Sequence, residues 1–294
     1  MKTPRWFLTA GLLAAIAVPA GRAQISITNE ALSYTEDFNH GYTSATTPTA
    51  NPLTWTDNTT IAGWSLYRTG GSGASAGAPA SIEVKTQDSA AGSVTSAGNF
   101  YLISETSAAA NFALGARVST TNSANGVFLV LSLVNNTGGT ITDASVGYTA
   151  LQWYYSTTAA NPISAGYSVS STGSYDLING AWTDIPDLAF TANNAVSPAP
   201  AKVSLNFNDA AFHHDYAATA IPDLTWNAGD TLVLRWLLDY NGSSTQQGLG
   251  IDNVNFAATA PVGAPIPEPA ATALLAGAVG LAGACAWRRR RQGG

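Results

Sequence analysis

The chain has 294 residues, and only 10% of them are charged, whereas Gly is frequent (28) and Cys occurs once. Between Gln24 and Ile266, five basic residues stand against seventeen acidic ones, a net charge of −12. This balance excludes nucleic-acid binding, which needs clustered Lys and Arg, and it suits neutral glycans or divalent cations. The same stretch has no Cys and six of the eight tryptophans, so we expect a folded region with a large core and no disulfides.

The first 23 residues have the pattern of a secretory signal peptide. Lys2 and Arg5 form a short basic region, residues 6–18 are apolar, and Gly21 and Ala23 are small residues at the positions that signal peptidase reads. We therefore predict cleavage after Ala23 and export through the inner membrane. The alternative is an uncleaved signal anchor.

Residues 24–260 consist of short alternating or apolar segments separated by turn residues, which predicts strands. The candidate strands are 31–38, 63–68, 81–86, 100–104, 111–119, 127–135, 141–155, 165–170, 182–185, 201–207, 231–238 and 249–256. A shift in the alternation at Asn253 indicates a bulge, and residues 70–79 read as a surface loop. No helical period longer than two turns appears in this region. We predict an all-β, antiparallel, two-sheet sandwich of the jelly-roll kind.

Three acidic residues are candidates for a metal site. Glu36 and Asp37 end the first of these candidate strands, and Asp252 lies in the last one. Because jelly rolls often bring these strands together, and because Ca²⁺ prefers carboxylate and carbonyl oxygens, we predict a structural calcium site there. The alternative is that Asp252 bonds a turn and Asp37 caps a strand end. We expect no other cofactor.

Two aromatic residues are candidates for ligand contact. Trp153 and Tyr155 would share one face of a strand, where exposed rings could stack on sugars. The alternative is that both are core residues, as we expect for Trp236, because most aromatic side chains are buried.

The sequence offers little for catalysis. His213 and His214 would point to opposite faces of a strand, so we interpret them as loop residues and not as metal ligands. There is no nucleophile elbow, zinc-protease motif or phosphate loop. A glycosidase needs two facing acids about 5–10 Å apart, which no sequence spacing here establishes. We predict that the protein is not an enzyme.

The C-terminal residues 261–294 have three parts in order: Pro267-Glu268-Pro269, an apolar run over 270–287, and Arg288, Arg289, Arg290 and Arg291. Eighteen apolar residues are enough for a short transmembrane helix, and the arginines would stop translocation on the cytoplasmic side. This order resembles the PEP-CTERM sorting signal of Gram-negative bacteria that make extracellular polysaccharide. The resemblance implies processing by an exosortase near the motif, and the alternative is a plain membrane anchor.

Short motifs in the mature region resemble the β-sandwich domains that accompany PEP-CTERM tails and secreted nucleases, which are similar in build to carbohydrate-binding jelly rolls. They are Glu36-Asp37-Phe38, the turn at 135–139, the Gly229-Asp230 turn before Leu234-Arg235-Trp236, and the run 250–254. The resemblance implies a fold and little about activity.

Together these patterns predict an exported cell-surface or extracellular-matrix protein that is membrane-anchored only until it is processed. Its partners would be signal peptidase, an exosortase and extracellular polysaccharide, and its sandwich would be a non-catalytic adhesive or glycan-associated module. The alternatives are a secreted glycan hydrolase or lyase on the same scaffold, and a purely structural coat protein.

Overall fold

The computed structural model describes residues 24–40, 52–69, 76–77, 81–86, 100–104, 111–118, 126–155, 160–193, 203–239 and 247–261. The predicted signal peptide (1–23) and, apart from Pro261, the predicted sorting signal (motif 267–269, span 270–287, stop 288–291) lie outside these residues. Within the described ranges, no helix has the length and apolar character needed to span a membrane.

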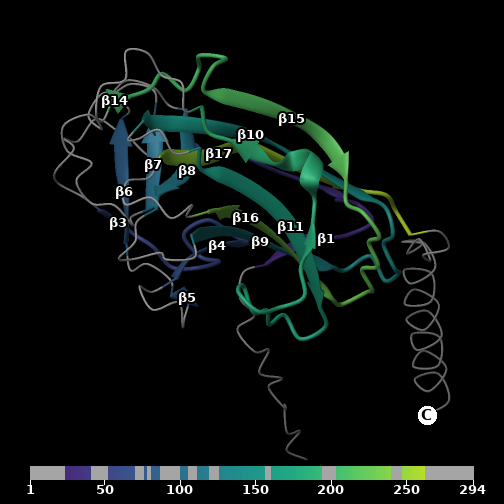
Figure 1. Ribbon diagram of the computed structural model, residues 1–294. Helices are drawn as coiled ribbons and strands as arrows, with labels where there is room; N and C mark the ends of the chain where they lie inside the picture. Colours follow the sequence, from purple (N-terminus) through teal and green to yellow (C-terminus); the bar gives the residue numbers. More distant parts are fainter. Residues whose placement is uncertain are drawn as a thin grey trace, which may run out of the picture.

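The chain forms two β-sheets packed face to face (Figure 1). The first sheet has the order β12-β11-β16-β9-β4-β5, with β1 added to β9 and β13 to β11. Its strands are β1 (Ile25–Ile27), β4 (Trp64–Thr69), β5 (Ala76–Gly77), β9 (Val127–Asn135), β11 (Pro162–Ser170), β12 (Thr183–Asp184), β13 (Phe190–Thr191) and β16 (Thr231–Leu238).

The second sheet has the order β14-β10-β17-β8-β7-β6-β3, with β15 added to β10 and β2 to β17. Its strands are β2 (Ser33–Glu36), β3 (Pro52–Thr54), β6 (Ser81–Thr86), β7 (Phe100–Ser104), β8 (Phe112–Arg117), β10 (Ala144–Tyr155), β14 (Val203–Ser204), β15 (His213–Ala220) and β17 (Gly248–Ala258). A single 3₁₀ turn, η1 (Pro186–Leu188), is the only helical element in the described residues. The all-β, two-sheet prediction is confirmed.

The core between the sheets is built around large aromatic side chains. Trp64 on β4 and Trp236 on β16 are stacked with their ring centroids 5.5 Å apart, and Tyr148 of the opposite sheet meets Trp236 edge-on at 5.7 Å. All three are almost fully buried. Such rings bury large apolar areas and prefer these stacked and edge-to-face arrangements, so they supply much of the stability that a domain without disulfides needs.

The bulge predicted at Asn253 is present. Opposite β10, the register of β17 shifts between Gly147 and Thr149, so that one extra residue of β17 fits between these two pairs. Asn253 has a φ of +49°, in the left-handed region that Asn tolerates better than most residues.

The structure corrects the sequence-based description in three places. His213, His214 and Asp215 begin strand β15, where a loop was predicted. This strand lies at the edge of its sheet and carries no continuous buried face, so it lacks the alternating pattern that reveals a strand. The residues 76–77 form a short strand inside the predicted loop 70–79, and two strand pairs, β1–β9 and β6–β7, are parallel in the otherwise antiparallel sandwich.

Candidate functional site

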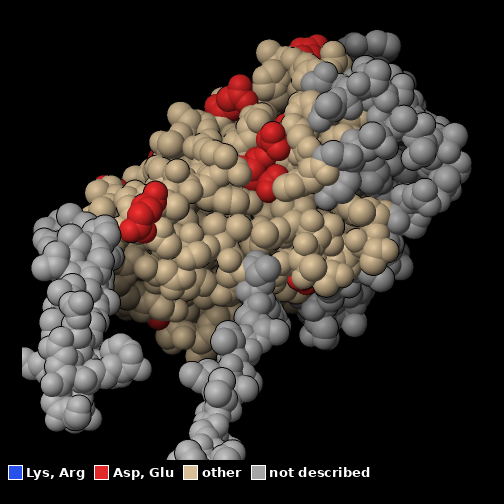
Figure 2. Space-filling view, turned by 180° about the vertical axis from the view of Figure 1, so that it is seen from behind, with Lys and Arg blue, Asp and Glu red and all other residues tan. Residues whose placement is uncertain are grey.

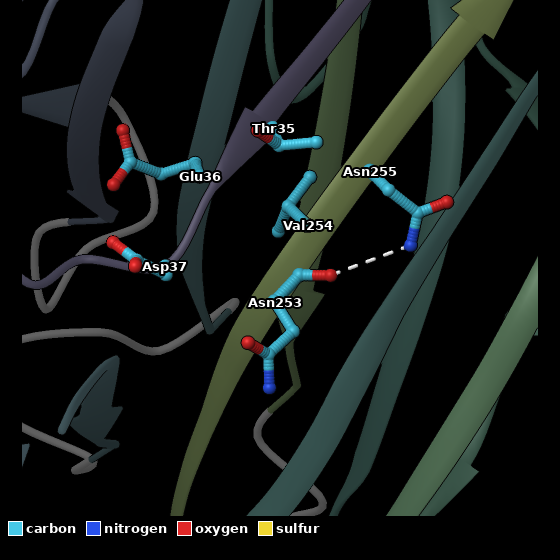
Figure 3. Close-up of a pocket in the computed structure, with 6 residues that line it drawn as sticks. All are labelled: Thr35, Glu36, Asp37, Asn253, Val254 and Asn255. Atoms are coloured by element: carbon cyan, nitrogen blue, oxygen red, sulfur yellow. Dashed lines mark hydrogen bonds between the residues drawn. The ribbon is translucent and has the colours of Figure 1, made fainter.

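The acidic residues singled out from the sequence lie where β2 meets β17. The two strands are antiparallel, with Glu36 opposite Val254, so the chain just beyond Glu36 runs beside the bulge at Asn253. Thr35, Glu36, Asp37, Asn253, Val254 and Asn255 line a shallow pocket of about 290 Å³ (Figure 3). In Figure 3, the carboxylates of Glu36 and Asp37 lie on the same side of this pocket, and the Nδ2 of Asn255 donates to the carbonyl oxygen of Asn253.

Glu36 is a buried carboxylate with several hydrogen-bond partners. Its Oε1 accepts the backbone N–H of Phe38 at 2.7 Å and lies 2.8 Å from Nε2 of His40, while its Oε2 accepts the hydroxyl of Tyr34 at 3.0 Å. Only 6% of the residue is exposed. These contacts hold the chain in the turn after β2, where Phe38 has a φ of +55°, so Glu36 has a structural role.

Asp252 is the second buried acid of the site, with 3% of its surface exposed. Burial raises its pKa to about 7, and the charges of Asp37 and Glu36 act in the same direction. The backbone N–H of Asn253, at 2.7 Å from Oδ1, and the side chain of Asn111 lower the pKa in part. The structure therefore brings Glu36, Asp37 and Asp252 close enough for their charges to interact, and water screens the buried Glu36 and Asp252 poorly.

The donor atoms at this place are hard oxygens of the kind that Ca²⁺ prefers. Besides the three carboxylates they include Oδ1 of Asn111, which accepts a hydrogen bond from Nδ2 of Asn39 at 3.3 Å. Across the described part of the chain, however, no three or more His, Cys, Asp or Glu side chains are arranged to hold a metal ion. A cation would thus need two further donors, the amide oxygen of Asn111 and the carboxylate of Asp37. This carboxylate is exposed, and its Oδ1 accepts the backbone N–H of Asn39 at 3.0 Å.

The two neighbouring histidines do not form a common site. Nε2 of His213 lies 4.0 Å from Oδ2 of Asp215, while the ring of His214 packs against Tyr216 at 4.4 Å. Asp215 also accepts the hydroxyl of Thr149 at 2.6 Å. The predicted separation of the two imidazoles agrees with this strand geometry, although the segment is a strand and not a loop.

The prediction that Trp153 and Tyr155 could contact a sugar is wrong. Trp153 and Tyr155 are 0% and 2% exposed, and Nε1 of Trp153 donates to the carbonyl oxygen of Leu249 at 3.2 Å. Trp153 belongs to a second small core on the outer face of its sheet, together with Tyr101 and Phe207. A ring without exposed surface cannot stack on a sugar, so the alternative of core residues describes this pair.

The sequence analysis missed a group of partly exposed rings on the outer face of the first sheet. We call it the outer aromatic cluster; it consists of Tyr67, Tyr175, Trp182 and Arg235. The signal available in the sequence was an arginine inside an apolar strand, at 235, and two aromatic residues in a turn-rich stretch, at 175 and 182. Neither shows which sheet face the stretch covers.

The visible charge of the surface is acidic. On the face shown in Figure 2, Asp and Glu side chains are scattered over the described surface and no Lys or Arg appears. This agrees with the net charge of −12 between Gln24 and Ile266.

No protein-family profile and no curated protein matches the chain. Among solved structures, the K3 cleaved adhesin domain of Lys-gingipain from Porphyromonas gingivalis is 18% identical over 50% of this chain and 74% of its own, with a TM-score of 0.29. A Cry1Da tryptic core variant from Bacillus thuringiensis is 12% identical over 60% of this chain, which spans 25% of the Cry1Da chain, with a TM-score of 0.26. At these scores neither likeness bears on the function of this chain.

Proposed function

We propose that the protein is an exported cell-surface or extracellular-matrix protein whose β-sandwich is a non-catalytic adhesive or glycan-associated module. The observation that carries the proposal is that the acids Glu36 and Asp252 at the β2–β17 junction are buried and bonded to other groups of the protein. Glu36 is bonded by Phe38 and Tyr34 and lies against His40, and Asp252 is buried beside it. Glycoside hydrolysis needs two carboxyl groups that both reach a sugar, whereas these two are buried and accept hydrogen bonds from neighbouring groups of the protein.

We further propose that this junction binds a structural calcium ion. The ion would draw together the oxygens of Glu36, Asp37, Asp252 and Asn111, which the described structure does not yet arrange around a metal ion. Burial is the main cause of the raised pKa of Asp252, and the charges of Asp37 and Glu36 add to it, so the three carboxylates repel one another when they are ionised. A divalent cation would remove that repulsion and tie the end of β2 to β17. The motif and apolar run of residues 267–291 support sorting by an exosortase, and residues 1–23 support export.

Calcium binding is tested by thermal unfolding of the protein in chelator and in increasing CaCl₂. We expect the melting temperature to rise with calcium and to stay unchanged with the same ionic strength of NaCl. At a calcium concentration of 100 times the Kd, the stabilisation would be about 2.7 kcal/mol. The variant Asp252→Asn should lose the response, while Asp143→Asn, an acid that bonds Thr259 at another place, should keep it. A calcium response that survives Asp252→Asn would rule out this site.

Export and sorting are tested by the mass and location of the protein in its host, with and without exosortase genes. A shorter product at the surface or in the matrix, found only when exosortase is present, is the expected result. A full-length, membrane-retained product in both strains would mean that the C-terminal segment is an ordinary anchor. A soluble-glycan degradation assay tests the enzyme alternative, since release of reducing sugar or unsaturated product would contradict a non-catalytic module.

A further inference from the structure

The outer face of the first sheet is covered by an arm of the chain, residues 171–182, which runs between β11 and β12. Leu177 is the anchor of the arm: it is 5% exposed and packs with Phe128, Val130 and Val233 on the sheet below. The backbone of the arm is held as well, because the carbonyl oxygen of Leu177 accepts Nη1 of Arg235 at 2.6 Å. The arm is therefore a fixed part of the fold, and the side chains at its border have defined positions.

The outer aromatic cluster lies at the border of this arm. The rings of Tyr67 and Tyr175 meet edge to face at 6.4 Å with their hydroxyls 3.4 Å apart, and Tyr175 meets Trp182 in the same way at 6.4 Å. The guanidinium of Arg235 stacks over the Trp182 ring at 4.1 Å. Each of these side chains is partly exposed. The result is a row of fixed rings at the surface, held from below by a cation.

The register of the strands places Arg235 in line with an acidic residue. Arg235 on β16 and Asp184 on β12 both stand opposite Gly166 of β11, the strand between them. Gly166 has no side chain, and a Cβ there would lie 3.4 Å from Oδ1 of Asp184. The arginine and the aspartate thus flank a position that carries no side chain and at which a Cβ would lie 3.0 Å from the carbonyl oxygen of Thr183. The charge of Asp184 acts on Arg235.

The polar groups of the cluster are suited to hydroxyl groups and not to anions. The cation of the cluster, Arg235, is already engaged by a ring and a carbonyl oxygen. Two exposed carboxylates lie beside the rings in the chain: Asp184, and Asp176, whose Oδ1 accepts the backbone N–H groups of Ile178 and Asn179. The Tyr67 hydroxyl keeps its proton, because burial and then the neighbouring Tyr175 hydroxyl raise its pKa. Carboxylates accept hydrogen bonds from sugar hydroxyls, and phenols both donate and accept them. The carboxylates would repel a polyanion.

We propose that the outer aromatic cluster is a binding site for a neutral polysaccharide, with pyranose rings packed on Trp182 and Tyr175 and their hydroxyls bonded to Asp184 and the tyrosine hydroxyls. This inference rests on the proposed role as a glycan-associated surface module and gives that role a place on the molecule. A protein partner is the other occupant that Tyr, Trp and Arg suit. The acidic, hydroxyl-rich border favours the glycan, because a neutral sugar chain offers many donors and no charge to desolvate.

The test is affinity electrophoresis of the full chain through gels that contain a soluble neutral polysaccharide, such as a β-glucan, a mannan or a galactan. Quenching of tryptophan fluorescence by oligosaccharides of the retained polymer gives the Kd. We expect Trp182→Ala to weaken binding about two- to tenfold, in line with the energy of a ring contact. Asp184→Ala, an exposed change that leaves the arm in place, should weaken binding as well.

A matched control is Tyr216→Ala, which removes a partly exposed ring from the opposite sheet and should bind as the wild type does. Equal binding by Trp182→Ala, Asp184→Ala and the wild type would overturn the assignment, as would the absence of binding to every neutral polysaccharide. Self-association that Trp182→Ala abolishes, without glycan binding, would overturn it in favour of a second copy. If the protein reaches the surface but binds no neutral glycan, only this inference fails. If it is not exported, the proposed function fails whatever the gels show.

Discussion

The indole Nε1–H of Trp64 donates a hydrogen bond to the hydroxyl of Tyr34 at 3.0 Å, and Tyr34 donates its own proton to Glu36. Trp64 belongs to the first sheet and Tyr34 to the second. This chain of hydrogen bonds therefore joins the aromatic core to the acidic junction between β2 and β17.

The link makes Tyr34 a stabilising residue although it is only partly buried. The variant Tyr34→Phe would leave the indole N–H of Trp64 without its acceptor in the core, at a cost of about 1–3 kcal/mol in the free energy of unfolding. Urea unfolding followed by fluorescence measures this loss. Tyr216→Phe, which removes a more exposed hydroxyl bond to Ala189, is the control and should cost less. Equal losses in the two variants would mean that the Trp64 bond adds nothing.

The buried Asp252 predicts a pH dependence. In the folded protein it keeps its proton up to about pH 7, whereas in the unfolded chain it releases the proton near its ordinary value of 3.8. Between these values the folded state binds more protons. Its contribution is therefore complete below pH 3.8 and is lost as the pH rises through about 7, a change on the order of a few kcal/mol.

The measurement is urea unfolding in chelator at pH 5 and pH 8, for the wild type and for Asp252→Asn. We expect the difference in stability between the two proteins to change in favour of the variant at pH 8. Calcium should restore the wild type more at pH 8 than at pH 5, because it binds the ionised carboxylate. Parallel pH profiles of the two proteins would contradict the assigned titration.

The bulge in β17 predicts a strong preference at one position. Asn253 has a φ of +49°, and its Nδ2 donates to the hydroxyl of Thr149 at 3.3 Å. A β-branched residue is disfavoured there, so Asn253→Val should lower the free energy of unfolding by about 1–2 kcal/mol. Asn253→Gly keeps the backbone conformation and should be milder. Thermal melts of the two variants decide the matter, and a Gly variant as unstable as the Val variant would point to the lost side-chain bond instead.

Close packing predicts that Gly248 is hard to replace. A Cβ at this position would lie 2.6 Å from Cε2 of Trp153 and 2.7 Å from Cβ of Tyr154. Gly248→Ala should therefore cost about 1–3 kcal/mol through displacement of the indole. In a double-mutant cycle, Gly248→Ala combined with Trp153→Leu should cost less than the sum of the single changes. Strict additivity would show that the two positions do not clash.

The arm over the first sheet predicts that lysine cannot replace Arg235. Lysine has neither the planar group that stacks on Trp182 nor the fork that reaches the carbonyl oxygen of Leu177. Arg235→Lys should raise the hydrogen-exchange rate of residues 171–182 severalfold and cost about 1 kcal/mol. Exchange in β9, in the centre of the same sheet, is the internal control. Unchanged protection of the arm would show that Leu177 alone anchors it.

The sequence predicts the central strands well for a physical reason. The ranges 127–135 and 231–238 were predicted to the residue, because these strands are apolar and end at turn residues. β15 was missed because an exposed edge strand needs no apolar face, and β1 and β5 because two or three residues carry no pattern. Trp153 was ambiguous because alternation shows which residues share a face and not whether something covers that face.

The candidate sites divide in the same way. Glu36 and Asp37 could be placed near Asp252 from the sequence. The first two lie near the end of the first candidate strand and Asp252 lies within the last one, and sandwiches tend to pair such strands. The contributions of Asn111 and His40 could not, because they depend on how a loop and a turn meet the junction. The outer aromatic cluster needs the arm 171–182 to fold back over three strands, which no local pattern encodes.

The position of β17 has a mechanical consequence. The strand is hydrogen-bonded along one edge to β10 and along the other to β8 and β2, all antiparallel to it. A pull on the chain beyond Ala258 that is directed along this strand would load the hydrogen bonds of both edges in shear, so they would have to break together. A domain that is anchored through its C-terminal side would thus resist force applied along β17, because the strands could not be separated one hydrogen bond at a time.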